Sequence, residues 1–594
     1  MRISNLVIKN YRNIQNINIA IDNSTAFIGD NNSGKSNILR ALTLPFLSND
    51  IGYNGKNLSW SDINNDAKNM YYQFIFDSFQ DILDGVIDIH EFEKALPKVL
   101  VEVTFKPKDN ELYFVKNFAS KINDNEEICY GLSYEFFPKS IPKVLKKVQE
   151  VLALQEIVDG NIQNLSSIRM NLLPTELYSH SIKVLNKEIS VPYDELKLFK
   201  YTSLVAERDD FSRSSNNLGS RSLVKLLQMK LDTRSQLQVE KEYTSFFDTL
   251  KNLSEMENII NWQENSKLEN AKVFFDKISI LPNMPNMNSL LSSVKLGYVG
   301  DDLSSQGLGH RNLILLLVLL NSFIDKERDT ALSVLTLEEP EAHLGIGNKN
   351  LISSFINAFV KEENSVQLFY STHSTEFINK VDFNNIVIVS DGHAVSLSQQ
   401  LSEAGKNYLS KNPNLDLYKF FFSKKCILVE GLSEELLIRS YINSQKRLSD
   451  ITVISFHKGF REIIDVWLKL NKDSSNYIGI VRDFDNQTKA QEDHESYNTF
   501  QNICVSTTHE YTLEPEIVST EGNYELLKKY FEDEFSWTVS SSENLSNQWR
   551  DAKASVMLQV CKDISNGKLS TLKLPGHIQE VIEFLSETQR KEII

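Results

Sequence analysis

A complete phosphate-binding loop near the start of the chain constrains its fold more than any other feature. Residues 29–36 read GDNNSGKS, which fits the pattern GxxxxGK[ST]. The loop follows an apolar run, 25–28, and precedes a helical pattern that begins near Asn37. In this context glycines let backbone N–H groups wrap phosphates, the lysine reaches the outer phosphates, and the hydroxyl coordinates Mg²⁺. The sequence therefore predicts an α/β core that binds ATP and magnesium.

A second apolar strand, 334–337, ends in the two carboxylates Glu338 and Glu339. We expect Glu338 to hold magnesium through water and Glu339 to polarise the attacking water. His373 follows a later strand-like run, where it could sense the γ-phosphate. An acidic turn after a buried strand and a structural histidine are the alternative interpretations.

The predicted nucleotide site also draws on positions far from the loop. Arg12 lies in the run KNYRN ahead of the loop and could be placed near the nucleotide. Ser305 and Gly307 belong to a Ser-Gly loop that opens a leucine-rich helix, where exposed N–H groups and the helix dipole favour an anion. The nucleotide-binding candidates are Arg12, Gly29, Asn31, Asn32, Ser33, Gly34, Lys35, Ser36, Asn37, Ser305, Gly307, Glu338 and His373.

A different chemistry is indicated some 400 residues later in the sequence. Glu430 ends an apolar run and is followed by Gly431, and Glu434 lies one helical turn onward on the same face. Asp483 and Asp485 follow another strand-like run, and strand alternation puts them on one side. Such carboxylates suit Mg²⁺ or Mn²⁺, and two ions could activate water and stabilise the leaving oxygen of a phosphodiester. Solvated acidic loops are the alternative.

Composition narrows the class of protein further. With 594 residues the chain is too long for one core, and 41% hydrophobic with 24% charged residues is typical of globular domains. A net charge of -16 is awkward for a nucleic-acid enzyme, although a local basic patch or bound metal reverses the local field. Four scattered cysteines, the lack of an apolar leader, and a longest apolar run confined to 313–320 predict a cytoplasmic protein without membrane contact.

The periodicity predicts an interrupted ATPase followed by a separate domain. Alternating segments at 100–105 and 130–137 favour antiparallel strands, and the patterns at 142–190 and 221–275 favour helices. After a polar stretch, four β-rich runs alternate with helical patterns and predict a small parallel sheet. The predicted parts are 1–160 and 291–400 for the ATPase, 161–290 for a helical insertion or dimerisation region, 401–419 for a linker, and 420–594 for the last domain.

These motifs together resemble known families. The nucleotide motifs are similar to those of ABC ATPases of the structural-maintenance, RecF and Rad50 type, and the strand–Glu–Gly and DxD motifs look like a Toprim domain. An ABC-type ATPase head with a helical insertion, followed by Toprim, resembles the OLD (overcoming lysogenisation defect) family, which includes anti-phage effectors such as the Gabija nuclease subunit and retron-associated OLD effectors. The signature here reads SSQGLG and Glu338 replaces the usual aspartate, so the resemblance implies slow hydrolysis.

The resemblance implies further site residues. Glu514 matches a downstream glutamate that helps to bind a second metal, and Lys568 matches a lysine that stabilises transition-state charge. Arg482, which precedes the first aspartate, is less typical and could lower the pKa of that aspartate. The implied catalytic residues are Glu430, Glu434, Asp483, Asp485, Glu514, Lys568 and Glu339, and the implied metal ligands are the five carboxylates among 430–514 together with Ser36 and Glu338.

The resemblance also implies partners and an activity. The signature of one protomer, at Ser305 and Gly307, would complete the ATP site of another, which predicts a homodimer or higher oligomer through the ATPase heads. The expected function is an ATP-regulated, metal-dependent DNA nickase or endonuclease in anti-phage defence, which a partner subunit or a retron-type nucleic acid could restrain. A RecF-like repair ATPase with a non-cleaving Toprim domain and an RNA-cutting Toprim effector are the alternatives.

Two groups of basic residues are candidates for DNA contact. One group is spaced to share a helical face, and the other is close in sequence to the predicted metal site, although most lysine clusters are solvated surface. The candidates are Lys139, Lys143, Lys146 and Lys147 in the first group, and Lys424, Lys425, Lys458 and Arg461 in the second.

Overall fold

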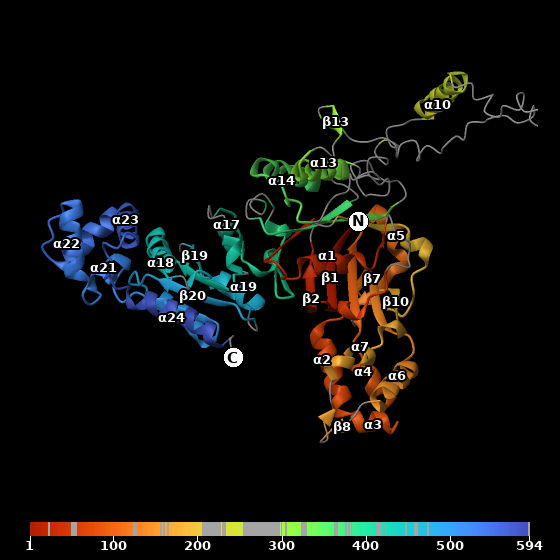
Figure 1. Ribbon diagram of the computed structural model, residues 1–594, viewed down its shortest axis with the longest axis horizontal. Helices are drawn as coiled ribbons and strands as arrows, with labels where there is room; N and C mark the ends of the chain where they lie inside the picture. The colour runs from red at the N-terminus through yellow and green to blue at the C-terminus, as the bar shows by residue number, and fades with distance from the viewer. Residues whose placement is uncertain are drawn as a thin grey trace, which may run out of the picture. The chain divides into compact units, whose positions relative to one another are not determined.

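The computed structural model in Figure 1 divides into two compact units. The larger unit comprises Met1–Leu204, Asp329–Glu339 and Ser365–Ile594, and the smaller unit comprises Val205–Arg328 and Pro340–Asn364. The residues that the structure describes are 1–21, 24–48, 56–122, 127–154, 157–158, 161–162, 165–204, 227, 233–253, 297–298, 300–302, 306–321, 330–361, 366–374, 377, 381, 383–411, 417–421, 423–445, 448–456, 461–471 and 474–591.

A seven-stranded sheet in the larger unit carries the phosphate-binding loop. Its order is β17 (His393–Ser396), β16 (Ile386–Ser390), β3 (Thr25–Ile28), β15 (Val366–Thr372), β14 (Leu332–Glu338), β11 (Phe199–Leu204) and β4 (Leu47–Ser48), and every neighbouring pair is parallel except β16 with β17. All residues of β14 are buried, as expected of a parallel strand covered on both faces. Helix α1 (Lys35–Thr43), which follows the loop, packs on β14 and β15.

An antiparallel sheet packs beside it in the same hydrophobic core. Its order is β10 (Tyr178–Val184), β7 (Glu127–Pro138), β5 (Val99–Lys106), β1 (Arg2–Tyr11) and β2 (Ile14–Ala20), and β6 (Ala119–Ile122) also pairs with β7. Burial alternates along β5, so one face of this sheet points to the core. The antiparallel strands predicted at 100–105 and 130–137 are confirmed.

Short helices complete this part of the larger unit. In α6 the apolar residues Val144, Val148 and Leu152 are buried at four-residue spacing, so the lysines take the opposite face. The other elements are α2 (Asn65–Asp77), α3 (Phe79–Leu83), α4 (Ile89–Ala95), α5 (Leu112–Val115), α6 (Ile141–Ala153), β8 (Ile157–Val158), β9 (Asn161–Ile162), α7 (Leu165–Leu172) and α8 (Tyr193–Leu196).

The helical prediction is wrong for part of 142–190 and for the start of the predicted insertion. Tyr178–Val184 forms the edge strand β10, and Phe199–Leu204 forms β11, which pairs with the buried strand β14. In β10 the buried residues are Tyr178, Ile182 and Val184, and in β11 they are Phe199, Thr202 and Leu204, so neither short run shows a strict alternation that would exclude a helix. The strands of the ATPase part therefore continue to Leu204.

A four-stranded parallel sheet forms the C-terminal part of the larger unit, as predicted. Its order is β19 (Thr452–Ser455), β18 (Lys425–Val429), β20 (Tyr477–Arg482) and β21 (Ile503–Thr507). Helix α24 packs on β20 and β21, where a Cβ at Gly479 would lie 2.1 Å from Val581. The helices are α18 (Leu432–Ser444), α19 (Arg461–Asn471), α20 (Thr488–Glu495), α21 (Leu513–Ser519), α22 (Asn523–Phe535), α23 (Ser542–Ser565) and α24 (Gly576–Lys591).

The stretch predicted as a linker has helical structure in its described residues. Helix α17 (Glu403–Lys411) and the start of the 3₁₀ helix η11 (Leu417–Phe421) occupy this region, and α16 (Leu397–Gln400) precedes it. Tyr418 is buried in a core that includes residues of both β16 and β18. The polar composition of residues 401–419 suggested a linker. It belongs instead to helical turns that face solvent and bury a few side chains such as Tyr418.

The smaller unit contains four described helices and strands besides α10 (Thr233–Leu253). They are β12 (Gly297–Tyr298), β13 (Asp301–Asp302), α13 (Leu308–Asn321) and α14 (Ile346–Lys361). Helices α13 and α14 pack together, and Asn312 Nδ2 donates to the carbonyl of Ala342 at 3.3 Å. Most of the predicted insertion lies outside the described residues, so its role in dimerisation stays a prediction. None of the described helices has the length and apolarity to cross a membrane.

Candidate functional site

The phosphate-binding loop lies between β3 and α1, with its backbone shaped by glycine. Gly34 has φ of 114°, and a Cβ there would lie 2.9 Å from the side chain of Asn13. Lys35 is buried, and its Nζ donates to the carbonyls of Gly29 at 2.8 Å and Asp30 at 2.7 Å. A phosphate that entered the loop would exchange these carbonyls for its own oxygens.

The loop and the end of β14 meet at a hydroxyl and a carboxylate. Ser36 Oγ donates to Glu338 Oε2 at 3.0 Å, and Arg40 Nε lies 3.5 Å from the other oxygen. Ser36 begins α1 and Glu338 ends β14, which is two strands from β3 in the sheet. Hydroxyl and carboxylate oxygens are suitable donors for Mg²⁺, so the two residues fit such an ion.

Glu339 and His373 also come together. Glu339 takes a left-handed conformation with φ of 43°, and its N–H donates to the carbonyl of Ser371 at 3.1 Å. Its Oε1 lies 3.3 Å from His373 Nδ1. A strained, tethered glutamate beside a histidine is the arrangement expected of a residue that orients water.

Arg12 lies at the phosphate-binding loop through partners that the sequence did not reveal. Its Nη1 donates to Asn37 Oδ1 at 3.1 Å, and its Nε donates to Asp62 Oδ1 at 2.9 Å. Burial opposes the ionisation of Asp62, yet hydrogen bonds from Ser59 and Arg12 keep its pKa below the ordinary value. Asn13 accepts from Asn37 at 2.7 Å and donates to the carbonyl of Ser33 at 3.2 Å. Neither Asp62 nor Asn13 belongs to a local sequence motif, so sequence reasoning missed both residues.

The signature loop is described only in part. Gly307 precedes α13 in the smaller unit, and its carbonyl accepts from the N–H of Arg311 at 3.2 Å. Ser305 lies outside the described residues. The completion of an ATP site by Ser305 and Gly307 of a second protomer stays a prediction.

The C-terminal sheet brings the second set of carboxylates to one edge. Glu430 follows β18, and Asp483 and Asp485 follow β20. Because β18 and β20 are parallel neighbours, their carboxyl ends meet at the same edge. Glu434 and Glu514 lie in the first turns of α18 and α21.

Hydrogen bonds tie the DxD turn to the segment before α21. The N–H of Phe484 donates to Thr508 Oγ1 at 2.9 Å, and the N–H of Asp485 donates to the carbonyl of Tyr511 at 3.1 Å. Thr512 Oγ1 donates to Glu514 Oε2 at 3.3 Å. The loop that carries Glu514 is thereby fixed to the turn that carries both aspartates.

Two of the five carboxylates, Asp483 and Glu434, have raised pKa values. Burial, and then the charges of Glu434, Glu430, Glu514 and Asp485, raise the pKa of Asp483 to about 9. Burial, followed by the charges of Glu514 and Glu430, raises the pKa of Glu434 to about 7. The set is therefore a concentration of negative charge that the surrounding protein only partly compensates.

Two further observations bear on whether this set fits a divalent cation. Buried Oε2 of Glu434 has no hydrogen-bond partner among the described residues, and a Cβ at Gly431 would lie 2.7 Å from it. Among the described residues, no three His, Cys, Asp or Glu side chains are gathered closely enough to hold a metal ion. The donor chemistry of the set fits Mg²⁺ or Mn²⁺, because both ions prefer carboxylate oxygens.

Arg482 corrects one expectation. Its Nε lies 3.2 Å from Glu430 Oε1, and its Nη1 donates to the carbonyl of Ala490 at 2.9 Å. The pKa of Asp483 is raised rather than lowered, so the expected effect of Arg482 on that aspartate is wrong. The arginine acts on the glutamate of the neighbouring strand, a partner that only the sheet order reveals.

The predicted basic residues divide according to their surroundings. Lys568 Nζ lies 2.7 Å from Glu534 and 3.8 Å from Asp563, so its predicted action at the carboxylates stays a prediction. Lys425 is buried and paired with Asp450 at 3.2 Å. It begins β18 whereas Glu430 follows the other end of that strand, so its predicted position beside the metal site is wrong.

The structure gives few contacts for the remaining candidates for DNA contact. Arg461 is exposed and lies 3.2 Å from Asp493, and Lys458 lies outside the described residues. Lys143, Lys146 and Lys147 are exposed on α6, on the face opposite its buried residues.

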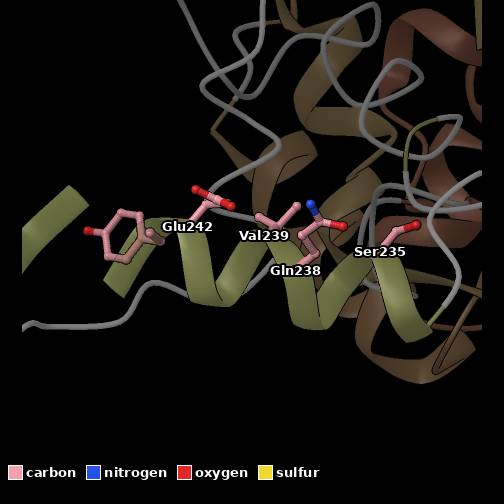
Figure 2. A pocket seen from close by; sticks show the side chains of 5 residues that line it. Ser235, Gln238, Val239 and Glu242 are labelled. Carbon is pink, nitrogen blue, oxygen red and sulfur yellow. The ribbon is translucent and has the colours of Figure 1, made fainter. Parts of the chain in front are cut away.

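The hollow in Figure 2 lies on α10, away from both sets of motifs in the sequence. It has a volume of about 500 Å³, and its described lining is Ser235, Gln238, Val239, Glu242 and Tyr243. All five residues come from one helix, and none belongs to a motif that binds phosphate or metal. It is therefore not the candidate site.

Comparisons with known proteins find similarity to an ATPase domain and to endonucleases. A family model described as an AAA ATPase domain matches residues 1–378. Endonuclease GajA of Bacillus cereus (strain HuB5-5) is 22% identical over an alignment of 508 positions, which covers 75% of this chain and 68% of that protein. Endonuclease GajA of Bacillus cereus (strain VD045) is 24% identical over 455 residues, with the same coverage. The sequence-based resemblance to OLD-family proteins is confirmed by these relatives.

Solved structures of two kinds are also similar to parts of the chain. The SMC head domain from Thermotoga maritima is 14% identical, covers 67% of this chain and 99% of its own, and gives a TM-score of 0.26. The C-terminal region of the Xanthomonas campestris pv. campestris OLD protein is 20% identical, covers 29% of this chain and all of its own, and gives a TM-score of 0.21. Because both TM-scores are low, the fold assignment rests on the strand order described above.

Proposed function

This chain belongs to the AAA ATPase domain family, and from that premise we propose that it is an ATP-regulated, divalent-metal-dependent endonuclease that nicks or cuts DNA. ATP would bind at the phosphate-binding loop, and cleavage would take place at a C-terminal Toprim domain of the OLD type. Its similarity to endonucleases over 75% of the chain supports the reaction class. A defence role against phage is part of the proposal and rests on the OLD resemblance.

The meeting of five carboxylates at one edge of the C-terminal sheet is the single observation that carries the proposal. They come from two strand ends and two helix starts, and burial together with the charges of the other four raises the pKa of Asp483 to about 9. Proteins seldom leave such charge uncompensated unless a cation or a reaction uses it. Divalent ions bound there would supply an activated water and stabilise the leaving oxygen of the phosphodiester.

The chain's own residues have separate tasks in this proposal. Glu430, Glu434, Asp483, Asp485 and Glu514 would hold the ions at the edge of the sheet that they share. The hydrogen bonds from the DxD turn to the 508–511 segment keep this edge assembled before substrate arrives. Such preorganisation lowers the cost of placing the phosphodiester in line with the attacking water.

The ATPase residues would act as a switch. Lys35 and the loop N–H groups would hold the phosphates, Ser36 and Glu338 would hold Mg²⁺, and Glu339 would orient the attacking water. Nucleotide bound across two heads, completed by the signature loop at Gly307, would stabilise one arrangement of a homodimer and so bias cleavage. The ATP site and the nuclease site would then belong to the same oligomer.

Plasmid cleavage tests the proposed reaction. Purified protein is incubated with supercoiled DNA in Mg²⁺, in Mn²⁺ and in EDTA, with matched single-stranded RNA as a second substrate. The proposal expects nicked or linear plasmid that depends on the metal. Cleavage of RNA alone would assign the enzyme to the RNA-cutting class. Unchanged DNA and RNA in both metals would contradict the proposal.

Plating efficiency tests the defence role independently. Bacteria that express the protein are challenged with a panel of phages beside bacteria that express Asp483→Ala. The proposal expects fewer plaques only with the wild-type chain. Equal plating for every phage would remove the defence role and leave the nuclease proposal standing.

A further inference from the structure

We propose that Arg482 is a positioning residue that holds one oxygen of Glu430 and supplies a permanent positive charge to the carboxylate set. This inference rests on the proposed function and deepens it, since it concerns how the chain orients one of the proposed ligands of the divalent cations.

The position of Arg482 is fixed at both branches of its guanidinium. Its Nε lies 3.2 Å from Glu430 Oε1, and its Nη1 donates to the carbonyl of Ala490 at 2.9 Å. The residue is buried at 7% exposure, where the planar guanidinium has little freedom to turn. A carboxylate oxygen engaged by a buried guanidinium has a fixed direction, so Arg482 would orient Glu430 toward the other carboxylates.

The charges of the set favour the same assignment. Asp483 interacts electrostatically with Glu434, Glu430, Glu514 and Asp485, which makes a group of five carboxylates. Among the described ion pairs, Arg482 provides the cationic group that contacts a member of this group. Divalent cations that bound here would displace the protons that Asp483 and Glu434 retain, and the five carboxylates with one guanidinium would then carry the negative charge that two divalent cations balance.

A purely structural ion pair predicts different behaviour. Loss of a structural arginine would disturb the site as a whole, so metal affinity and cleavage rate would fall together. Loss of a positioning arginine makes the set more negative, which favours cation binding, while Glu430 loses its fixed orientation. Affinity and rate would then change in opposite directions.

The chain offers a matched control in Arg439. Its Nε lies 2.8 Å from Glu435 Oε1, and its Nη2 donates to the carbonyl of Val453 at 2.7 Å. Arg439 therefore has the same two kinds of anchor as Arg482, but Glu435 is outside the carboxylate set.

The experiment measures Mn²⁺ binding by calorimetry and plasmid cleavage at saturating metal for the full-length protein. Arg482→Gln is expected to bind Mn²⁺ at least as tightly as the wild type and to cut roughly 10- to 100-fold more slowly. Arg482→Lys keeps the charge without the planar fork, so it is expected to retain wild-type affinity and still cut several-fold more slowly. Arg439→Gln is expected to change neither quantity.

The outcomes separate this inference from the function on which it rests. Parallel loss of affinity and rate in both Arg482 variants, or no change in either, would overturn the inference while wild-type cleavage upholds the function. Wild-type protein that binds no Mn²⁺ and cuts nothing would overturn both. If Arg482→Gln does not fold, the Arg482→Lys split between affinity and rate decides the matter.

Discussion

The two candidate sites face opposite electrostatic problems. At the phosphate-binding loop the cations are already paired, because Lys35 donates to two loop carbonyls and Arg12 is held by Asp62. At the C-terminal edge five carboxylates interact, and the Arg482 guanidinium lies 3.2 Å from one of them, Glu430. The cationic side chains of the first site have internal hydrogen-bond partners, whereas the carboxylates of the second site repel one another.

This difference indicates what each site is built to bind. A loop of N–H groups and an internally bonded lysine can accept a phosphate by exchanging partners, at little cost to the fold. A set of repelling carboxylates is destabilised until a cation arrives, so cation binding would add directly to folding stability. Loss of one charged group should therefore have opposite effects on stability at the two sites.

The largest expected effect is on cleavage by Asp483→Ala. The residue interacts with every other carboxylate of the set, so its loss removes the common ligand and should lower cleavage by at least roughly 1,000-fold. Plasmid nicking and ATP binding are measured in parallel, and ATP binding should not change. Asp493→Ala, an exposed carboxylate paired with Arg461, is the control and should cut normally. Cleavage retained in Asp483→Ala would refute the site assignment.

Glu339→Gln should have the next largest effect, confined to the other site. The glutamate beside His373 would no longer polarise water, so ATP hydrolysis should fall roughly 100-fold or more while ATP affinity is kept. Phosphate release and binding of a fluorescent ATP analogue measure the two quantities. Hydrolysis at the wild-type rate would exclude Glu339 as the residue that activates water.

Lys35→Ala should weaken ATP binding without affecting Mn²⁺ binding at the carboxylates. The lost charge-assisted bond to phosphate is expected to lower ATP affinity roughly 10- to 100-fold. Lys94→Ala, an exposed lysine on α4, serves as the matched control. A cleavage rate that changes in Lys35→Ala would show that nucleotide binding gates the nuclease. ATP affinity unchanged by the substitution would contradict the nucleotide site.

The smallest expected effect is on the stability of the metal-free protein. The folded-state pKa of Asp483, about 9, lies above its ordinary value of 3.8, so its stabilising contribution is lost as pH rises toward 9. One such group costs roughly 2–3 kcal/mol between pH 6 and pH 8, and Asp483→Asn should remove that cost. Thermal unfolding in EDTA at both pH values measures it. An equal loss of stability in wild type and variant would contradict the repulsion described above.

Much of the fold could be predicted because its signals are local. The apolar run before residues 29–36 predicted β3 and α1, and alternation after residue 420 predicted the parallel sheet. The short strands β10 and β11 were missed because each spans few residues and neither alternates strictly between buried and partly buried positions, so their patterns do not exclude a helix.

The arrangement within the candidate sites was less accessible to sequence reasoning. Lys425 is close to Glu430 in sequence, yet at about 3.3 Å per residue a strand separates its two ends widely. The pairing of Arg482 with Glu430, and of Arg12 with Asp62, depends on which strands and loops become neighbours. Such contacts between distant segments leave no spacing signal in the chain.

The central claim is that the C-terminal carboxylates form a divalent-cation site, and the number of Mn²⁺ ions bound per chain tests it most directly. Electron paramagnetic resonance counts bound Mn²⁺ in wild-type protein and in Asp483→Ala, both without nucleotide. The account predicts two ions per wild-type chain and loss of this binding in Asp483→Ala. Wild-type protein without bound Mn²⁺, or equal binding in both proteins, would contradict it.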